Sequence, residues 1–223
     1  MREMIKRIPI VGSFIIKTFR EVFFKIMPFP GSEQYWIERY NSGRNSGEGS
    51  YNKLAEFKAE TINDFVKDNN IETIIEYGCG DGNQLRLAEY PSFIGFDVSP
   101  KAIELCRQIF QHDKGKRFSL MSEYKGETAQ LTLSLDVIYH LVEDEIYYSY
   151  MERLFNSSER FVIIYSSDFD KEQKYHEKRR QFTRWVKTNK PHWKLIRQIP
   201  NRFQYDDKSE EGSLSDFYIY EKA

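Results

Sequence analysis

Three glycines at alternate positions follow a short apolar run in "IIEYGCGDG", where Glu76 precedes Gly78, Gly80 and Gly82. Such a turn brings backbone N–H groups close to a ligand, because glycine has no Cβ to obstruct the approach. Between a strand and a helix, these N–H groups suit a polar, nucleotide-like cofactor. The spacing is G-x-G-x-G, whereas a dinucleotide-binding turn has G-x-G-x-x-G. The pattern therefore favours a ligand other than a dinucleotide.

A further acidic residue, Asp97, closes the apolar stretch "FIGFD" 15 residues after Gly82. An acid at the end of the second strand of a nucleotide-binding unit can accept hydrogen bonds from both hydroxyls of a ribose. The glycine turn and Asp97 together predict a site for the nucleoside part of a cofactor. We place Val98, the next residue, in the same site.

Two of the four histidines have a context that suggests chemistry. His140 follows Asp136 by four residues, just past a predicted strand, and the carboxyl ends of parallel strands form the binding crevice of an α/β sheet. A histidine there can act as a general base, or it can cap the following helix. His176, the second candidate catalytic residue, lies in "KYHEKRRQFTRW", where Arg179 and Arg180 suit a phosphate or carboxylate on an acceptor. The alternative for this stretch is a solvated basic helix face.

The polar, glycine-rich segment 31–53 predicts a lid that closes over the cofactor, with a plain surface loop as the alternative. We predict Arg44 in this segment and Tyr139, beside the candidate base, as acceptor contacts. Cys79 lies inside the glycine turn and is predicted to be a small buried residue next to the cofactor. No cluster of His, Asp or Glu has metal-ligand spacing beyond "HLVEDE", and acids at the start of a helix commonly pair with the helix dipole, so we predict no metal.

Strand-like and helix-like stretches alternate around these residues. This order predicts an α/β protein with a Rossmann-like, seven-stranded, mostly parallel sheet and helices on both faces. After Pro191, "WKLIRQI" and "SDFYIYEK" predict a closing antiparallel hairpin. Residues 31–223 form this domain, and 168–192 form an insertion on the acceptor side. Predicted strands cover 71–77, 93–97, 118–121, 132–138 and 160–166, and predicted helices cover 54–67, 84–90, 100–111 and 143–155.

The composition fits one medium domain in a reducing compartment. With 33 basic and 34 acidic residues among 223, the net charge of -1 provides no field that would attract nucleic acid. The two cysteines, Cys79 and Cys106, form no CxxC pair, which argues against a disulfide framework. We recognise no secretory signal and expect a cytoplasmic protein with no nucleic-acid partner.

Residues 1–30 differ from the rest, since they carry six Lys or Arg against two Glu. Apolar residues recur there at helical spacing from Ser13 onward, which predicts an amphipathic helical extension. The longest uncharged run, residues 8–16, is about half of what a membrane-spanning helix needs. We therefore expect the extension to dock on its own domain, on a second subunit, or peripherally on the inner face of the cell membrane.

The motifs "EYGCGDG", "GFDVS" and "LSLDVIYHL" resemble the successive motifs of class I S-adenosylmethionine-dependent methyltransferases, over roughly residues 71–166. The resemblance implies S-adenosylmethionine as the cofactor, bound by the turn at 76–82 and by Asp97. It also implies that Asp136 belongs to the fourth motif of that family. Met121 and Ser122, after the third strand, would flank the adenine.

A wider resemblance covers most of the chain. The stretches "YNSGRNSGEGSYNKLAEFKAE", "DVIYHLVEDE" and "HEKRRQFTRW" are similar to bacterial methyltransferases that accompany cell-envelope polysaccharide synthesis. This implies O-methylation of a sugar or related glycan precursor, with a small-molecule acceptor of another class as the alternative. The amino-group methylation signature N/D-P-P-Y/F is absent after Asp136, which favours oxygen. Two other hypotheses stay open: a nicotinamide-dependent oxidoreductase, and a non-catalytic module that anchors a membrane-associated complex.

Overall fold

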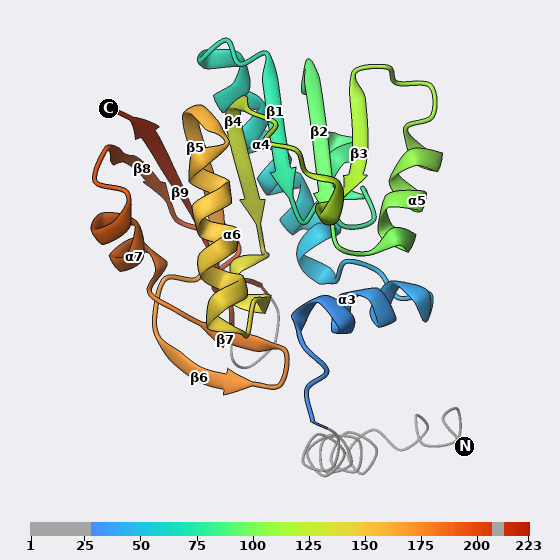
Figure 1. Cartoon of the computed structure of the whole chain (residues 1–223). Coiled ribbons are helices and arrows are strands. Elements are labelled where there is room, and N and C mark those ends of the chain that lie inside the picture. The colour runs from blue at the N-terminus through green and yellow to red at the C-terminus, as the bar shows by residue number, and fades with distance from the viewer. Residues whose placement is uncertain (1–27, 207–211) are drawn as a thin grey trace.

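The computed structural model describes residues 28–206 and 212–223, so the predicted amphipathic extension lies almost entirely outside the described residues. No helix within those two ranges is both long enough and apolar enough to cross a bilayer. The main sheet has seven strands, shown in Figure 1. They are β1 (Thr73–Tyr77), β2 (Ser92–Asp97), β3 (Lys116–Leu120), β4 (Ala129–Leu135), β5 (Ser158–Ser166), β8 (Trp193–Ile199) and β9 (Asp216–Lys222).

The strand order is β3-β2-β1-β4-β5-β9-β8. The first five strands in the chain run parallel, and β9 pairs antiparallel with both β5 and β8. The closing hairpin therefore joins the sheet through its second strand, which lies between β5 and β8. This confirms the predicted fold class of a mostly parallel sheet with an antiparallel hairpin at its end.

Four helices cover the two faces of the sheet. On one face lie α4 (Asn52–Asp68) and α5 (Pro100–Ile109), and on the other lie α6 (Asp144–Asn156) and α7 (Phe182–Asn189). Each face buries its own apolar core, because successive side chains of a strand point to opposite sides. In β1, for example, Ile74 packs with the first pair of helices and Ile75 with the second.

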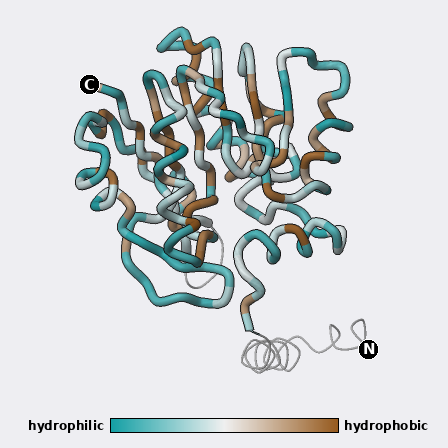
Figure 2. The backbone as a smooth tube through the Cα atoms, viewed as in Figure 1, coloured by the Kyte–Doolittle hydropathy of each residue, from teal (hydrophilic) through white to brown (hydrophobic). Residues whose placement is uncertain are grey.

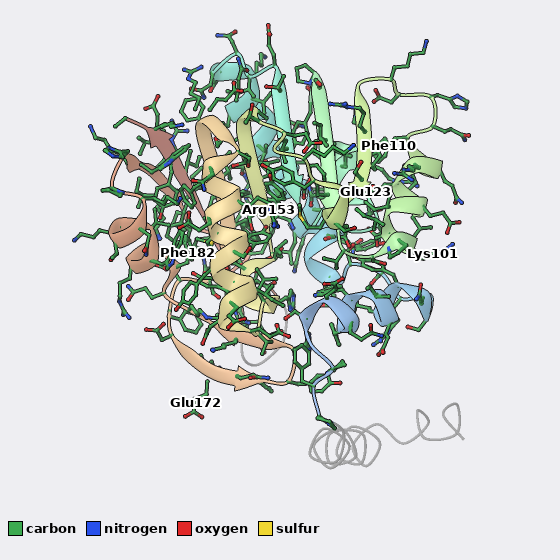
Figure 3. The ribbon with its side chains drawn as sticks, in the orientation of Figure 1. Lys101, Phe110, Glu123, Arg153, Glu172 and Phe182 are labelled. Carbon is green, nitrogen blue, oxygen red and sulfur yellow. The ribbon has the colours of Figure 1, made fainter. Side chains whose placement is uncertain are left out.

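Burial on both faces explains why the central strands are apolar almost throughout. Figure 2 shows hydrophobic segments gathered along these strands, while the outer loops are hydrophilic. Phe182 points from α7 toward the sheet in Figure 3 and is fully buried, whereas Glu172 extends away from the body and is exposed.

Two predicted elements differ from the structure. The helix predicted at 84–90 is only a 3₁₀ turn, η2 (Gln84–Leu87). Asn63 of α4 donates to the carbonyl of Leu87 (2.9 Å) and accepts from the N–H of Glu89 (3.0 Å). These contacts hold the chain extended after the turn, so the helix does not continue.

The strand predicted at 132–138 ends at Leu135. Asp136 has φ of 59°, in the left-handed region, which a strand cannot accommodate. The chain then turns into the short 3₁₀ helix η4 (Ile138–His140). This early end brings His140 over the edge of the sheet instead of leaving it in an extended segment.

The carboxyl ends of the parallel strands face α3 (Ser32–Asn41), as Figure 1 shows. After α3 comes the 3₁₀ turn η1 (Glu48–Ser50), and both belong to the segment predicted as a lid. The predicted acceptor-side insertion contains a separate two-stranded sheet, β6 (Lys171–Lys174) and β7 (Glu177–Arg179), followed by α7.

Candidate active site

A cavity of about 690 Å³ lies at the carboxyl ends of β1, β2 and β4. The glycine turn and the ends of the strands line one side, and Trp36, Ile37 and Tyr40 of α3 line another. Most residues predicted for the cofactor meet here, although they come from four separate places in the sequence. Those that line the cavity are Glu76, Gly78, Cys79, Gly80, Asp97, Val98, Met121, Ser122 and Asp136, together with His140.

Asp97 is buried at the end of β2 and fixes the glycine turn. Its Oδ2 accepts from the N–H of Gly80 (3.0 Å) and its Oδ1 accepts from the N–H of Ser99 (2.9 Å). Burial raises the pKa of Asp97 to about 6, although these backbone donors act in the opposite direction. A carboxylate has about four acceptor positions, so Asp97 can still accept hydrogen bonds from a ribose. The end of β2 therefore fits the nucleoside part of S-adenosylmethionine.

The turn admits only glycine at position 80. Gly80 has φ of 59°, and a Cβ there would meet the hydroxyl oxygen of Ser46. Ser46 also donates its N–H to Asp81 Oδ2 (2.9 Å), and its Oγ accepts from the N–H of Asp81 (3.1 Å). Tyr51 donates to the same carboxylate (2.9 Å). The segment predicted as a lid is thus attached directly to the glycine turn.

Three residues predicted to bind the cofactor or the acceptor make contacts that do not suit that role. Gly82 packs against α5, where a Cβ would lie 3.0 Å from Cys106 Sγ, and it does not line the cavity. Cys79 lines the cavity, but its thiol contacts Cys106, and this contact and burial raise its pKa. It therefore stays protonated and unreactive. Arg44 is exposed, donates to Ser42 Oγ (3.0 Å) and lines neither of the two cavities described here.

Lys58 is a site residue that we did not predict from the sequence. It is fully buried on α4, lines the cavity, and places its Nζ 2.9 Å from Asp136 Oδ2. The other oxygen of Asp136 accepts from Tyr139 (3.1 Å) and Ser215 (3.0 Å). The sequence did contain an indication that Lys58 is buried. Lys58 lies four residues after Leu54 and four before Ile62, so it is a charged residue on the apolar face of its helix.

His140 lies at the edge of the cavity, and its ring is held on several sides. Its Nδ1 lies 3.2 Å from the carbonyl oxygen of His176, and Trp36 contacts the ring edge to face with centroids 5.0 Å apart. Because a carbonyl can only accept, Nδ1 must carry the proton, which leaves Nε2 with its lone pair. Burial and the neighbouring His176 lower the pKa of His140 to about 4. At neutral pH it is therefore an uncharged base.

A smaller cavity of about 140 Å³ adjoins the first one. The two predicted histidines and Tyr139 line it, and it also has the polar side chains of Arg39 and Glu48. Five residues line both cavities and so form the boundary between them: Trp36, Ser46, Ser50, Asp136 and His140.

The imidazoles of His140 and His176 are stacked, with centroids 5.2 Å apart and planes 9° apart, and Tyr35 stacks on His176 in turn. A histidine binds a metal through its ring edge. Glu177 also lies close to this pair, but stacked rings do not direct both edges at one ion. We therefore regard the histidines as a stacked pair, and the absence of a metal stays a prediction.

The arginines predicted to bind an anionic acceptor are paired within the protein. Arg179 donates to Glu177 (3.0 Å) and to Ser167 (2.9 Å), and its guanidinium lies over Tyr139. Arg180 donates to Asp144 and to the carbonyl oxygens of Leu141 and Val142. Arg180 thus attaches the insertion to the segment that carries His140.

We expect Arg180→Met to lower the free energy of unfolding by about 2–4 kcal/mol, because the carbonyl oxygens of Leu141 and Val142 and the exposed carboxylate of Asp144 lose their charged donor. Urea denaturation measures this difference. The matched control is Arg184→Met, since Arg184 also pairs with an aspartate but its side chain is 68% exposed. Exposed ion pairs contribute roughly 0–1 kcal/mol. Equal effects of the two substitutions would contradict the role of Arg180 in attaching the insertion to the segment that carries His140.

Glu76 is the most strongly perturbed acid of the cavity. Burial raises its pKa from 4.5 to about 7, although the charge of Lys58 partly opposes the rise. The folded state then binds the proton more tightly than the unfolded state between these two values. Stability therefore falls as pH rises from about 4.5 to 7 and stays reduced above it.

We expect Glu76→Gln to remove this loss of folding stability at high pH. The variant should be more stable than the natural chain at pH 8, by roughly 3 kcal/mol, and nearly equal to it at pH 4. Asp97 contributes a similar slope in both proteins, so the comparison isolates Glu76. Urea denaturation at several pH values measures the difference, and a difference that did not change with pH would refute the burial effect.

The sequence was compared with family models, and the fold was compared with solved structures. A family model described as a methyltransferase domain matches residues 68–211. The fold resembles the methyltransferase domain of bacterial CtHen1 (20% identity, TM-score 0.60), covering 77% of this chain and 100% of that one. It also resembles magnesium protoporphyrin IX methyltransferase from Synechocystis PCC 6803 with bound SAM (17%, 0.62), covering 86% of this chain and 97% of that one.

The N-methyltransferase NodS from Bradyrhizobium japonicum WM9, in complex with S-adenosylhomocysteine, has 12% identity and a TM-score of 0.64. The match covers 86% of this chain and 98% of that one. No curated protein matches in sequence. At these identities the solved structures establish the fold, and the family model establishes the class. The chain is therefore a member of the S-adenosylmethionine-dependent methyltransferase family.

Proposed function

We propose that this enzyme transfers a methyl group from S-adenosylmethionine to a hydroxyl group of a sugar or related cell-envelope glycan precursor. The observation that carries the proposal is the boundary between the two cavities. The larger cavity has the residues that suit the donor, the smaller one is available to an acceptor, and His140 lines both. A donor and an acceptor bound in them would meet beside an uncharged imidazole.

The lining of the smaller cavity favours a polyhydroxylated acceptor. Trp36 and Tyr139 contribute aromatic side chains to the lining, and Arg39, Glu48 and Ser50 contribute donors and acceptors for hydroxyl groups. A strongly anionic acceptor has less support, because Arg179, Arg180 and Arg184 are paired with carboxylates. The resemblance of the chain to methyltransferases of polysaccharide synthesis supports the same acceptor class.

When bound, S-adenosylmethionine supplies a methyl group carried on a positively charged sulfur. The protein contributes positioning and removal of a proton. His140, with Nδ1 held by the His176 carbonyl, takes at Nε2 the proton that the acceptor hydroxyl loses. Trp36 and Tyr40 of α3 line the cavity and would shield a bound donor from water. Asp97 and the glycine turn hold the nucleoside part.

The test is a methyl-transfer assay with radiolabelled S-adenosylmethionine. Each acceptor is offered at equal concentration: sugars, nucleotide sugars, and their amino-sugar counterparts. We expect label in a methyl ether of a sugar, identified by mass spectrometry. Label on nitrogen, or transfer only to acceptors without a sugar, would overturn the acceptor class while leaving the enzyme a methyltransferase.

A further inference from the structure

The two ends of α3 are attached to different parts of the active site. Past its last turn, Ser46 is bonded to Asp81 in the glycine turn. At its first turn, Ser32 lies against the segment that follows His140, and it is buried there with 2% of its surface exposed. The second contact therefore joins the helix that lines both cavities to the segment that carries the proposed base.

Glu143 caps α3 from outside that helix. The residue before the helix is Gly31, which has no side chain to accept from the free N–H groups of the first turn. Glu143 takes this role, because its Oε1 accepts from the N–H of Ser32 (2.9 Å) and its Oε2 accepts from the hydroxyl of Ser32 (2.5 Å). Gly31 has φ of 100°, and a Cβ there would lie 3.1 Å from Oε1. The glycine thus leaves room for the carboxylate.

The charge of Glu143 favours this contact at neutral pH. Burial raises the pKa of Glu143, but hydrogen bonds from Ser32 and from its own N–H, with the charge of Arg180, outweigh burial and lower the pKa overall. The side chain is therefore a carboxylate at neutral pH. A negative charge is favourable at the N-terminus of a helix, where the free N–H groups point outward.

Val142, two residues after His140, is bonded on both sides of its backbone. Its N–H donates to the hydroxyl oxygen of Ser32 (2.9 Å), and its carbonyl accepts from Arg180 (2.9 Å). Ser32 thus accepts from Val142 and donates to Glu143, so one hydroxyl contacts two consecutive residues of this segment. A displacement of α3 would therefore displace the chain next to the base.

The rings of α3 also contact the base. Trp36 contacts His140 edge to face, and Tyr35 stacks on His176 with centroids 4.5 Å apart. His176 in turn stacks on His140. Because Trp36 lines both cavities, the position of α3 sets the lining of the cavities and the surroundings of the His140 ring together.

We propose that Ser32 and Glu143 are positioning residues for methyl transfer, because their contact holds α3 along the two cavities and in register with His140. Both act through α3 and the segment after His140, not on the reacting atoms. The inference rests on the proposed function, since it takes His140 as the base. It assigns a role to two residues that have no proposed contact with the donor or the acceptor.

The first measurement is the dissociation rate of S-adenosylhomocysteine, by surface plasmon resonance, which requires no acceptor. We expect dissociation to be about tenfold faster in Ser32→Ala and in Glu143→Ala, because a hydrogen bond to a charged group is worth roughly a factor of ten or more. Glu143→Gln keeps the size of the side chain and one acceptor oxygen, so its rate should lie between those of Glu143→Ala and the natural chain. In the double variant Ser32→Ala should add less than it does alone, because both substitutions remove the same contact.

The second measurement is single-turnover methyl transfer at saturating donor and acceptor. We expect a loss of about tenfold in Ser32→Ala and in Glu143→Ala, because small errors in position are costly for this reaction. Glu143→Gln should restore part of the rate. A merely structural contact would lower the temperature of unfolding and leave the rate of the folded enzyme unchanged.

Two exposed residues provide matched controls. Ser42, just past the other end of α3, donates its hydroxyl to the carbonyl of Arg39. Glu159 accepts from the hydroxyl of Thr128 and lines neither cavity. Neither Ser42→Ala nor Glu159→Ala should change the dissociation rate or the transfer rate.

The outcomes separate this inference from the proposed function. Thermal unfolding verifies that each variant is folded, and Ser32→Ala, which removes no charge, decides the matter if Glu143→Ala does not fold. Unchanged dissociation and transfer in the folded variants would overturn the inference and leave the donor and base assignments intact. Faster dissociation with unchanged transfer would also overturn the positioning role. Unchanged transfer in His140→Gln would instead overturn the proposed base, and its positioning with it.

Discussion

Asp97→Ala is expected to weaken the binding of S-adenosylhomocysteine by about 10²- to 10⁴-fold. Asp97 is buried at the end of β2, and its charge can accept from two ribose hydroxyls. Each hydrogen bond to a charged group is worth about 1.5–3 kcal/mol. The substitution also removes the acceptor of the Gly80 N–H, so the turn loses its anchor. Calorimetry of the natural chain and the variant measures the loss.

Two controls make this result specific. Asp113→Ala removes an exposed aspartate that lies outside both cavities, and it should leave the affinity unchanged. Asp97→Asn keeps the size of the side chain and one acceptor oxygen, so it should lie between the natural chain and Asp97→Ala. If Asp97→Ala bound S-adenosylhomocysteine as tightly as the natural chain, the nucleoside would have to lie elsewhere.

His140→Gln is expected to lower the rate of methyl transfer by about 10²- to 10⁴-fold, the usual contribution of a general base. The affinity for S-adenosylhomocysteine should change little, because we place the donor contacts on the glycine turn and on Asp97. Single-turnover transfer to the sugar acceptor found by screening measures the rate. His112→Gln, at an exposed position, is the control. A loss of donor affinity that matched the loss of rate would indicate a structural histidine.

The pH dependence of the natural enzyme tests the same role. Burial and His176 lower the pKa of His140, whereas Glu177 and Asp136 raise it, and the net value is about 4. The uncharged, proton-accepting form then predominates at every pH above about 5. We expect His140 to impose no acid-side loss of kcat/KM between pH 6 and 8. A loss centred near pH 6.5 that disappeared in His140→Gln would show an ordinary, solvated histidine instead.

The order of strands and helices was predictable because local patterns carry it. β-branched runs bounded by glycine and proline predict the parallel strands, and an apolar stripe predicts α4. Two boundaries were wrong for reasons that lie outside the local pattern. Asn63 ends the turn at Leu87 from a neighbouring helix, and Asp136 ends β4 by adopting a left-handed conformation.

The histidines illustrate what the sequence left open. The position of His140 after the fourth predicted strand indicated the edge of the sheet, but nothing local indicated its stacking on His176, 36 residues later. The arginines after His176 suggested an anion site, and the structure pairs them with acids from α6 and from the segment before β6. Charge in the sequence does not reveal which charges are already compensated.

The sequence by itself determined the family, and it predicted the glycine turn and Asp97 as donor contacts, because such groups act through backbone geometry within a short stretch. Only the tertiary structure decided the composition of the site. Lys58 becomes a site residue because α4 packs beside the glycine turn, and His140 meets His176 because an insertion folds back over the sheet. Such contacts depend on distances between elements, which side-chain packing sets and local sequence patterns do not encode.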